Sequence, residues 1–133
     1  MATELSPQCR EAKHPGHTKH PGHTLARLAR QVEVAVATVE LTLAQYRVLA
    51  ILGDGCEAAS ALAEKLAVSR PSITGVVDGL VARGLVSREP TPGDRRRIDV
   101  GLTEAGRALL TAADAAVEQR MERISQLLEE LPR

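Results

Sequence analysis

Residues 69–103 read SRPSITGVVDGLVARGLVSREPTPGDRRRIDVGLT, and this stretch decides the fold. Its pattern predicts a helix over residues 70–83, a stop at Gly84, and a β-hairpin whose tip carries three arginines. The major groove of B-DNA admits a helix, and its narrow minor groove attracts inserted arginines. The stretch therefore offers one probe for each groove of a DNA duplex.

The predicted helix has a signal at each end and two different faces. Ser69 can cap its start, Pro71 fits the first turn, where its missing N–H costs nothing, and Gly84 ends it. Apolar residues recur at helical spacing on one face: Ile73, Val76, Val77, Leu80 and Val81. The opposite face carries residues that are short, polar or without a side chain: Arg70, Ser72, Thr74, Gly75, Asp78 and Gly79. This second face suits close approach to base edges and phosphates.

The hairpin is predicted from two alternating runs and the turn between them. Residues 85–88 and 98–102 alternate as strands, and Pro92-Gly93 supplies type II turn chemistry. The tip is then expected to present Arg95, Arg96 and Arg97. Three arginines on a loop are more often a solvated charged tip than a nucleic-acid contact, so the hairpin alone leaves both interpretations open.

The residues upstream complete a recognisable unit. Residues 42–45 form a capping box that opens a helix through Leu52, and residues 58–66 form a second helical run before a turn at residues 67–68. Three helices followed by a two-stranded wing make a winged helix-turn-helix, which we place at residues 42–103. The expected fold class is mainly α with a small β-wing.

Two amphipathic stretches flank this unit, at residues 24–41 and 104–133. The second is expected to be one long C-terminal helix, and one small domain cannot cover the whole of its apolar stripe. Either stripe could be ordinary core, but we expect both to be dimerisation helices. The residues expected at the homodimer interface are Leu25, Leu28, Val32, Val117, Met121, Ile124 and Leu128.

Three segments carry a likeness to a known family. They are LTLAQYRVL at residues 41–49, LVARGLV at residues 80–86, and the Asp94-Arg95-Arg96 wing followed by LTEAG at residues 102–106. Together they closely resemble the MarR family (multiple-antibiotic-resistance regulators) of bacterial transcription factors, over roughly residues 25–131. The most specific part is the Asp-x-Arg wing signature, matched by Asp94 and Arg96.

The resemblance implies roles for particular residues. The helix at residues 70–83 would enter the major groove, Arg96 would reach into the minor groove, and Asp94 would brace the wing. The DNA-binding residues implied or inferred in this way are Ser69, Arg70, Ser72, Thr74, Arg95, Arg96 and Arg97. The implied protein is a homodimeric repressor that binds a pseudo-palindromic operator in double-stranded DNA.

The resemblance also implies a ligand. Small aromatic or phenolic effectors commonly bind in this family between the DNA-binding unit and the dimer helices. Tyr46 and Arg47 lie on the helix nearest that junction and are the candidate ligand-binding residues, although both are more often structural.

The sequence departs from the family pattern in two places. Gly75 and Gly79 stand on the exposed helix face where many relatives carry arginine, and each should cost the helix about 1 kcal/mol relative to alanine. They are either tolerated gaps or positions that let the backbone approach DNA more closely. Relatives usually add a further C-terminal helix beyond the predicted one, so a smaller or differently built dimer interface is expected here.

Composition limits the classes of partner. The formal net charge is zero, but residues 69–107 hold seven Arg against five acidic residues, and local charge sets a DNA footprint. The chain has no Trp or Phe and one Tyr, so it lacks the stacking platforms of single-strand and RNA modules. No segment reaches the apolar length of a membrane span, and no signal-peptide core is present, which predicts a cytoplasmic protein without a membrane partner.

The N-terminus contains the repeat KHPGHT, at residues 13–18 and again at residues 19–24. Type II turns in each His-Pro-Gly-His would bring histidines together in a spacing suited to Zn²⁺. The candidate ligands are His14, His17, His20 and His23. The simpler interpretation is a polar, disordered leader over residues 1–23, and we expect neither a metal nor a cofactor.

Other classes of protein fit less well. The chain from Leu25 onward contains no histidine, no phosphate-binding glycine loop and no metal-ligand cluster, so we do not expect an enzyme. A DNA-silent dimerisation or interaction protein with the same fold is the main alternative. A metal-responsive regulator, or a redox-responsive one acting through Cys9 or Cys56, is a further variant.

Overall fold

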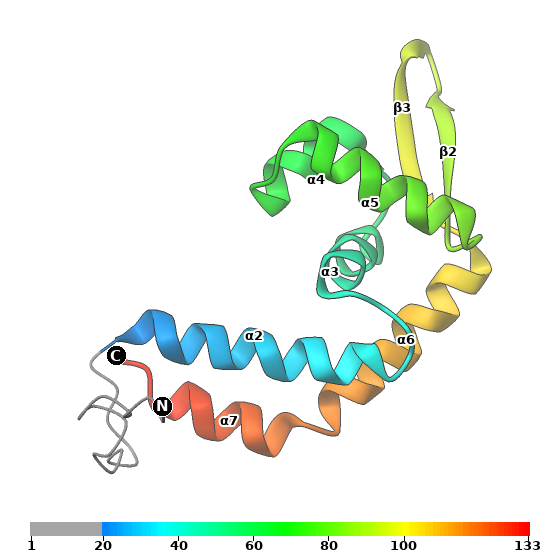
Figure 1. Cartoon of the computed structure of the whole chain (residues 1–133). Coiled ribbons are helices and arrows are strands. Elements are labelled where there is room, and N and C mark those ends of the chain that lie inside the picture. The colour runs from blue at the N-terminus through cyan, green and yellow to red at the C-terminus, as the bar shows by residue number, and fades with distance from the viewer. Residues whose placement is uncertain (1–19) are drawn as a thin grey trace, which may run out of the picture.

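The protein is described here by a computed structural model that covers residues 20–133. Cys9, His14 and His17 lie outside the described residues, as does most of the expected leader. The rest of the chain forms two parts, an arm of three helices and a winged unit at residues 42–103 (Figure 1).

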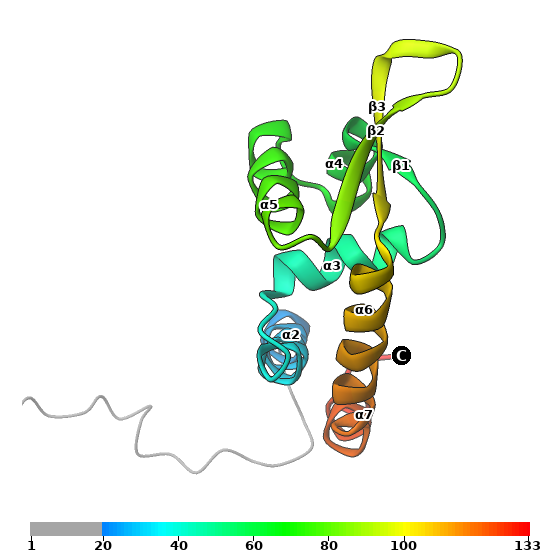
Figure 2. The same ribbon diagram turned by 90° about the vertical axis from the view of Figure 1, so that its right-hand side faces the viewer.

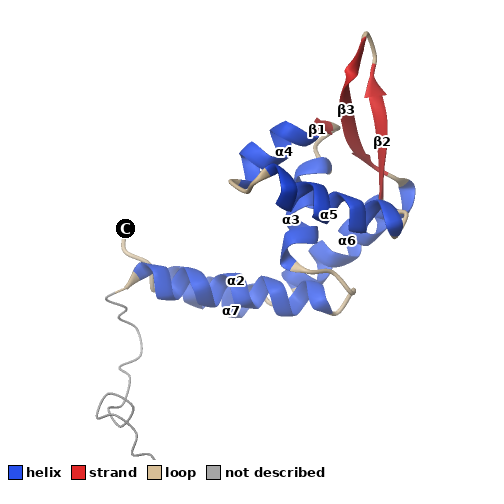
Figure 3. Ribbon diagram, turned by 45° about the horizontal axis from the view of Figure 1, so that its top comes forward, coloured by secondary structure: helices blue, strands red, loops and turns tan. Residues whose placement is uncertain are grey.

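The arm consists of helices from the two ends of the described chain. These are α2 (Pro21–Ala37), α6 (Glu104–Glu118) and α7 (Met121–Glu129). Helix α2 packs against both α6 and α7. Figure 3 shows α2 and α7 running side by side, away from the sheet.

The expectation of one long C-terminal helix at residues 104–133 is wrong. The helix breaks at residues 119–120, and Arg120 Nη1 there donates a hydrogen bond to Gln31 Oε1 of α2 at 2.8 Å. Beyond the break, Ile124 and Leu127 are buried. Helix α7 packs alongside α2. The bend therefore buries two apolar side chains that a straight helix would carry away from α2.

The start of α2 also differs from the prediction. The helix begins at Pro21, so His20 is its N-cap and His23 lies in its first turn, and neither belongs to the leader. His23 N–H donates to His20 O at 2.9 Å, and Gly22 keeps a negative φ, so this second repeat does not form a type II turn. Proline is well suited to the first turn of a helix.

Two of the four candidate metal ligands, His20 and His23, lie among the described residues. The imidazole rings of His20 and His23 have centroids 4.7 Å apart. Within residues 20–133, however, no three His, Cys, Asp or Glu side chains gather closely enough to hold a metal ion.

The winged unit has the three helices that the sequence predicts, namely α3 (Leu43–Leu52), α4 (Ala59–Leu66) and α5 (Arg70–Ala82). The capping box of α3 is confirmed. Gln45 N–H donates to Thr42 Oγ1 at 3.1 Å, and Thr42 N–H donates to Gln45 Oε1 at 3.0 Å. Ala67, in the left-handed conformation, ends α4.

The hairpin of β2 (Val86–Thr91) and β3 (Asp94–Leu102) extends from the winged unit (Figure 2). A third short strand, β1 (Glu57–Ala58), was not predicted. It pairs with β3, so the sheet is antiparallel in the order β1-β3-β2. The mainly helical fold with a small wing is thus confirmed, with one more strand at its edge.

One apolar core runs from the winged unit into the arm. It joins α3, α4 and α5 to the base of the sheet and to α2 and α6, and its fully buried large side chains include Val36, Val48, Leu49, Leu52, Leu62, Ile73, Val77, Leu80 and Val100. On α5, Ile73, Val77 and Leu80 occupy the predicted core face. Val81 does not, because it lies at the edge of that face and is 36% exposed.

Candidate nucleic-acid interface

The first turn of α5 is organised by Ser69. Ser69 Oγ accepts the N–H of Ser72 at 3.2 Å and donates to Ser72 Oγ at 2.9 Å. The hydroxyls of Ser69 and Ser72, two of the predicted DNA-binding residues, are therefore bonded to each other in the cap. Arg70 and Thr74 follow, and both are exposed.

The two unusual glycines of α5 face different surroundings. A methyl group at Gly75 would meet nothing within 4 Å, so this position lies on the open face as predicted. A methyl group at Gly79 would lie 3.8 Å from Gln45 Nε2 of α3. Placing Gly79 on the fully exposed face was therefore wrong, because α3 packs beside that part of α5.

The hairpin tip has an irregular backbone. Gly93 has φ +84°, which supports the expected turn at Pro92-Gly93. Asp94 pairs with Thr91 and Ile98 pairs with Pro90, so residues 95–97 have no Cα partner on β2 and bulge from the ladder. Bulges of this kind change the direction of side chains.

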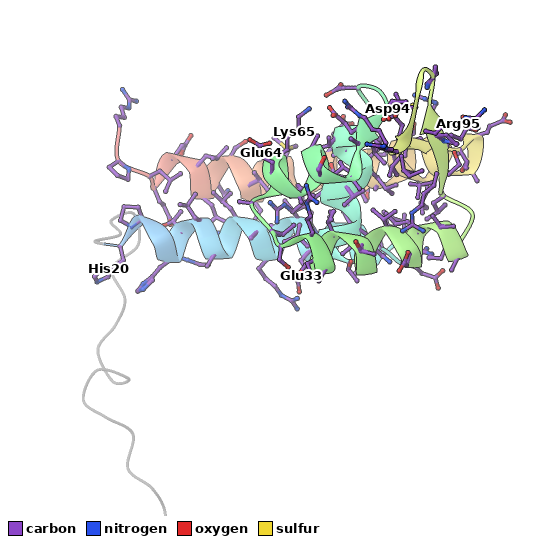
Figure 4. The ribbon with its side chains drawn as sticks, turned by 90° about the horizontal axis from the view of Figure 1, so that it is seen from above. His20, Glu33, Glu64, Lys65, Asp94 and Arg95 are labelled. Carbon is purple, nitrogen blue, oxygen red and sulfur yellow. The ribbon has the colours of Figure 1, made fainter. Side chains whose placement is uncertain are left out.

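The three arginines of this bulge differ in their contacts. Asp94 Oδ1 accepts the N–H of Arg96 at 3.0 Å, a hydrogen bond that ties the Asp94 side chain to the backbone of the bulge. Arg97 Nε lies 3.6 Å from Asp99 Oδ1 in a loose ion pair. Arg95 and Arg96 have no ion-pair partner among residues 20–133. Figure 4 shows Asp94 and Arg95 on the hairpin, at the opposite end of the molecule from His20.

An ion pair that the sequence did not reveal connects the wing hairpin to helix α5. Arg88 of β2 pairs with Asp78 of α5. The sequence shows the two opposite charges, but only the packing of β2 against α5 makes them neighbours. Both remain partly exposed, so the pair adds little to the stability of the fold.

Tyr46 and Arg47, predicted as ligand-binding residues, lie on different sides of α3. Tyr46 Oη donates to Asp114 Oδ1 of α6 at 2.6 Å, at the junction of winged unit and arm. Arg47 Nη2 donates to Leu66 O at 2.9 Å, toward α4. Successive residues of a helix point about 100° apart, so the two side chains have different neighbours.

Arg47 instead lines a small apolar pocket between α3, the end of α4 and the start of α5. Its volume is about 100 Å³, and its lining consists of Ala44, Arg47, Val48, Leu66, Val68, Ser72, Ile73 and Val76.

Tyr46 does not line this pocket. Burial, together with the hydrogen bond to Asp114 and its negative charge, raises the pKa of Tyr46 to about 12.

The seven residues expected at a dimer interface fall into two groups. Leu25, Met121 and Leu128 expose 54%, 41% and 49% of their surface. Val32 and Val117 are half-buried against the core of their own subunit, Leu28 is half-buried on α2, and Ile124 is 8% exposed. Ile124 is therefore not available to a partner, since its own subunit already covers it.

The winged unit is the part of the chain that matches a known protein family. The sequence profile of the MarR family matches residues 41–98. The homoprotocatechuate degradative operon repressor of Escherichia coli is 30% identical over 103 residues, which cover 68% of this chain and 70% of that protein. This chain belongs to the MarR family.

A second relative is more similar over a shorter stretch. The HTH-type transcriptional repressor NicR of Pseudomonas putida is 45% identical over 74 residues, or 55% of this chain. The match spans about half of NicR, at 47% of its length.

Solved structures of MarR-family proteins have the same fold. The repressor CouR, bound to a 23-mer DNA duplex, is 34% identical with a TM-score of 0.73, covering 80% of this chain and 77% of CouR. NadR in complex with 4-hydroxyphenylacetate is 27% identical with a TM-score of 0.70, covering 89% and 86% of the two chains. Across residues 20–133, none of the helices has the length and apolarity needed to cross a membrane.

Proposed function

We propose that the protein is a sequence-specific transcriptional repressor that binds double-stranded DNA as a homodimer and performs no catalysis. The observation that carries the proposal is the joint presentation of α5 and the arginine bulge at residues 95–97. Both stand on the surface opposite the arm, and the Asp78–Arg88 pair links them. A helix for the major groove and arginines for the minor groove are thereby presented on one surface.

The proposal extends to residues, place of action and effector. Arg70 and Thr74 contact bases, Ser69 and Ser72 hold the first turn against the phosphates, and Arg96 enters the minor groove with Arg95 and Arg97 beside it. Asp94 holds the backbone that carries Arg96. The protein acts in the cytoplasm, where its operator lies, and responds to a small aromatic or phenolic molecule. The DNA-bound state of CouR and the 4-hydroxyphenylacetate complex of NadR support this assignment.

An operator of altered spacing tests the proposed function. A two-fold dimer reads two half-sites about one helical turn, or roughly 10 base pairs, apart. Inserting about 5 base pairs between them turns one half-site to the far face of the duplex, and we expect most of the affinity to be lost. Footprinting beside the protein's own gene identifies the site, and a mobility-shift titration measures the loss. Indifference to the insertion would indicate a monomer, and binding to no duplex would favour the interaction-protein alternative.

Arg96→Ala should weaken binding to all duplexes by a similar factor. A minor-groove arginine responds to shape and charge more than to base identity, so cognate and random duplexes should lose affinity alike. The slope of log affinity against log salt should fall by about 1 if Arg96 also neutralises a phosphate. Arg123→Ala removes the same charge from an exposed position of α7 and serves as the control. Equal affinity of the Arg96 and Arg123 variants at fixed salt would refute the assignment of the wing.

Gly75→Ala and Gly79→Ala form a matched pair that separates the two interpretations of these glycines. Both positions have room for a methyl group, so each substitution should raise the free energy of unfolding by about 1 kcal/mol. Only Gly75 faces open space, so Gly75→Ala should also weaken cognate binding if the backbone approaches DNA there. Urea unfolding and a DNA titration measure the two effects. Unchanged affinity in both variants would make Gly75 a tolerated gap.

A further inference from the structure

The arm and the winged unit are joined by two short chain connections. One is Thr103, between β3 and α6, and the other is residues 38–42, between α2 and α3. Figure 2 shows the second connection rising from α2 to α3 beneath α5. It forms a closed turn, in which Leu41 N–H donates to Val36 O at 3.1 Å. The orientation of the winged unit on the arm therefore depends in part on how this turn is held.

Glu40 has an unusual backbone conformation in this turn. Its φ is +60°, in the left-handed region that residues with a side chain seldom adopt. Many helices end in a residue of this conformation, and that residue is usually glycine. A side-chain-bearing residue keeps such a conformation where the surrounding contacts hold it. The contacts made by Glu40 therefore matter for the geometry of the connection.

Arg83, at the end of α5, makes one of these contacts. Its Nη1 donates to Glu40 O at 2.7 Å and to Gln45 Oε1 of α3 at 3.3 Å. Hydrogen bonds from a charged donor are roughly twice as strong as those between neutral groups. The same Gln45 oxygen accepts the N–H of Thr42 in the capping box of α3. One guanidinium therefore joins the end of α5 to the turn and to the start of α3.

A small change of orientation at this connection is sufficient to matter for an operator. Successive base pairs lie about 3.4 Å apart along DNA and are turned by about 35°. In a two-fold dimer, a displacement of one α5 is repeated in its mate, so the separation of the two helices changes by up to twice as much. A shift of under about 2 Å in each subunit therefore corresponds to one base pair of half-site spacing.

We propose that Arg83 is a positioning residue that determines which half-site spacing the dimer accepts, because its bonds to Glu40 and Gln45 fix the orientation of α5 relative to the arm. This inference rests on the proposed function. Arg83 acts through the position of α5 and itself binds no DNA. Without its bonds the winged unit takes a wider range of orientations. The native spacing then loses affinity, and neighbouring spacings are accepted more nearly equally.

The first experiment measures operator affinity as a function of half-site spacing. The footprinted operator is prepared unchanged, with one base pair removed, and with one or two base pairs inserted between its half-sites. We expect Arg83→Ala to lose about fivefold or more in affinity on the native spacing and under about twofold on the altered spacings. An equal loss at every spacing, or no loss at any, would overturn the proposal.

Two further variants separate the hydrogen bonds from the charge and from the bulk of the side chain. Arg83→Met keeps a long side chain without its donors and should show the same flattened spacing preference as Arg83→Ala. Arg107→Ala removes the charge of an exposed α6 arginine whose side chain makes no hydrogen bond or ion pair with residues 20–133, and it should keep the wild-type preference. Circular dichroism shows whether each variant keeps its fold. A wild-type preference in folded Arg83→Met would refute the role of the bonds.

The salt dependence of binding distinguishes positioning from a direct phosphate contact. An exposed arginine beside a DNA-binding helix can also neutralise a phosphate. If Arg83 acts only within its own subunit, Arg83→Ala should leave the slope of log affinity against log salt unchanged, in contrast to Arg96→Ala. A fall in the slope by about 1 would make Arg83 a phosphate contact and would overturn the proposal.

A distance measurement without DNA tests the same inference. Cys56 is an exposed cysteine of the winged unit, and Cys9→Ser leaves it as the sole cysteine of the chain. Double electron–electron resonance between spin labels on Cys56 reports the distance between the two winged units of a dimer. The distribution of distances should be broader in Arg83→Met than in the wild type or in Arg107→Ala. Equal widths in a protein that binds its operator would refute this inference alone, whereas the absence of any coupling would mean that no dimer forms, and the inference would fail together with the proposed function.

Discussion

Gly106→Ala should be among the most destabilising single substitutions in this protein. A methyl group at Gly106 would lie 1.9 Å from Leu85 O and 2.9 Å from Leu85 C, both of which are backbone atoms. No rotation of a side chain relieves such a clash, so α6 must move away from the start of the wing. Overpacking of this kind costs about 3 kcal/mol, which we expect as a loss in the free energy of unfolding measured by urea.

The surrounding contacts explain why α6 cannot move cheaply. Leu85 O accepts the N–H of Thr103 at 3.1 Å, and Thr103 Oγ1 accepts the N–H of Gly106 at 3.0 Å. The same hydroxyl donates to Gly84 O at 2.7 Å. These bonds attach the first turn of α6 to the chain just beyond α5.

Gly75→Ala serves as the control for this substitution. It adds the same methyl group to a helical glycine, but in open space, and should stabilise the protein. A Gly106→Ala protein as stable as the wild type would show that the first turn of α6 does not rest on Leu85.

Leu128→Asp should separate the proposed dimer into monomers. Leu128 is 49% exposed on α7, and Leu25 and Met121 are exposed large apolar residues of the same arm. If a second subunit covers them, the new carboxylate becomes buried without a partner, which is costly. Light scattering should detect monomers, and the loss of the second half-site should reduce operator affinity by about 100-fold or more.

Ile124→Asp is the informative comparison, because Ile124 is buried within its own subunit. That substitution should unfold the subunit and lower the helical signal in circular dichroism, whereas Leu128→Asp should leave the helices intact. A Leu128→Asp protein that remains dimeric would place the interface on another surface.

Local chemistry made the winged unit predictable from the sequence. The capping box at Thr42 and Gln45, the serine cap at Ser69 and the turn at Pro92-Gly93 each depend on residues within a few positions of one another. Burial of Ile73, Val77 and Leu80 followed from helical periodicity in the same way. The candidate DNA-contacting residues were also found in this way, since they lie on the faces that the apolar pattern leaves open.

The errors arose where packing overrides local preference. The placement of Gly79 on an open face failed because α3 packs beside it. Tyr46 and Arg47 are neighbours in the sequence, but their side chains bond to different helices, Tyr46 to Asp114 of α6 and Arg47 to Leu66 of α4. No alternation of residues marks the short strand β1, which exists only because β3 offers it an edge.

The sequence by itself determined where α3 and α5 begin, the turn of the hairpin and the membership of the family, because each depends on short-range chemistry or on a local motif. The tertiary structure alone decided the break at Arg120, the clash that requires Gly106, and the bond of Tyr46 to Asp114, which lies 68 residues away along the chain. The physical reason is the separation along the chain of the residues that interact. A cap or a turn brings together neighbours in the chain, whereas the other features depend on which surfaces remain to be buried once the helices have formed.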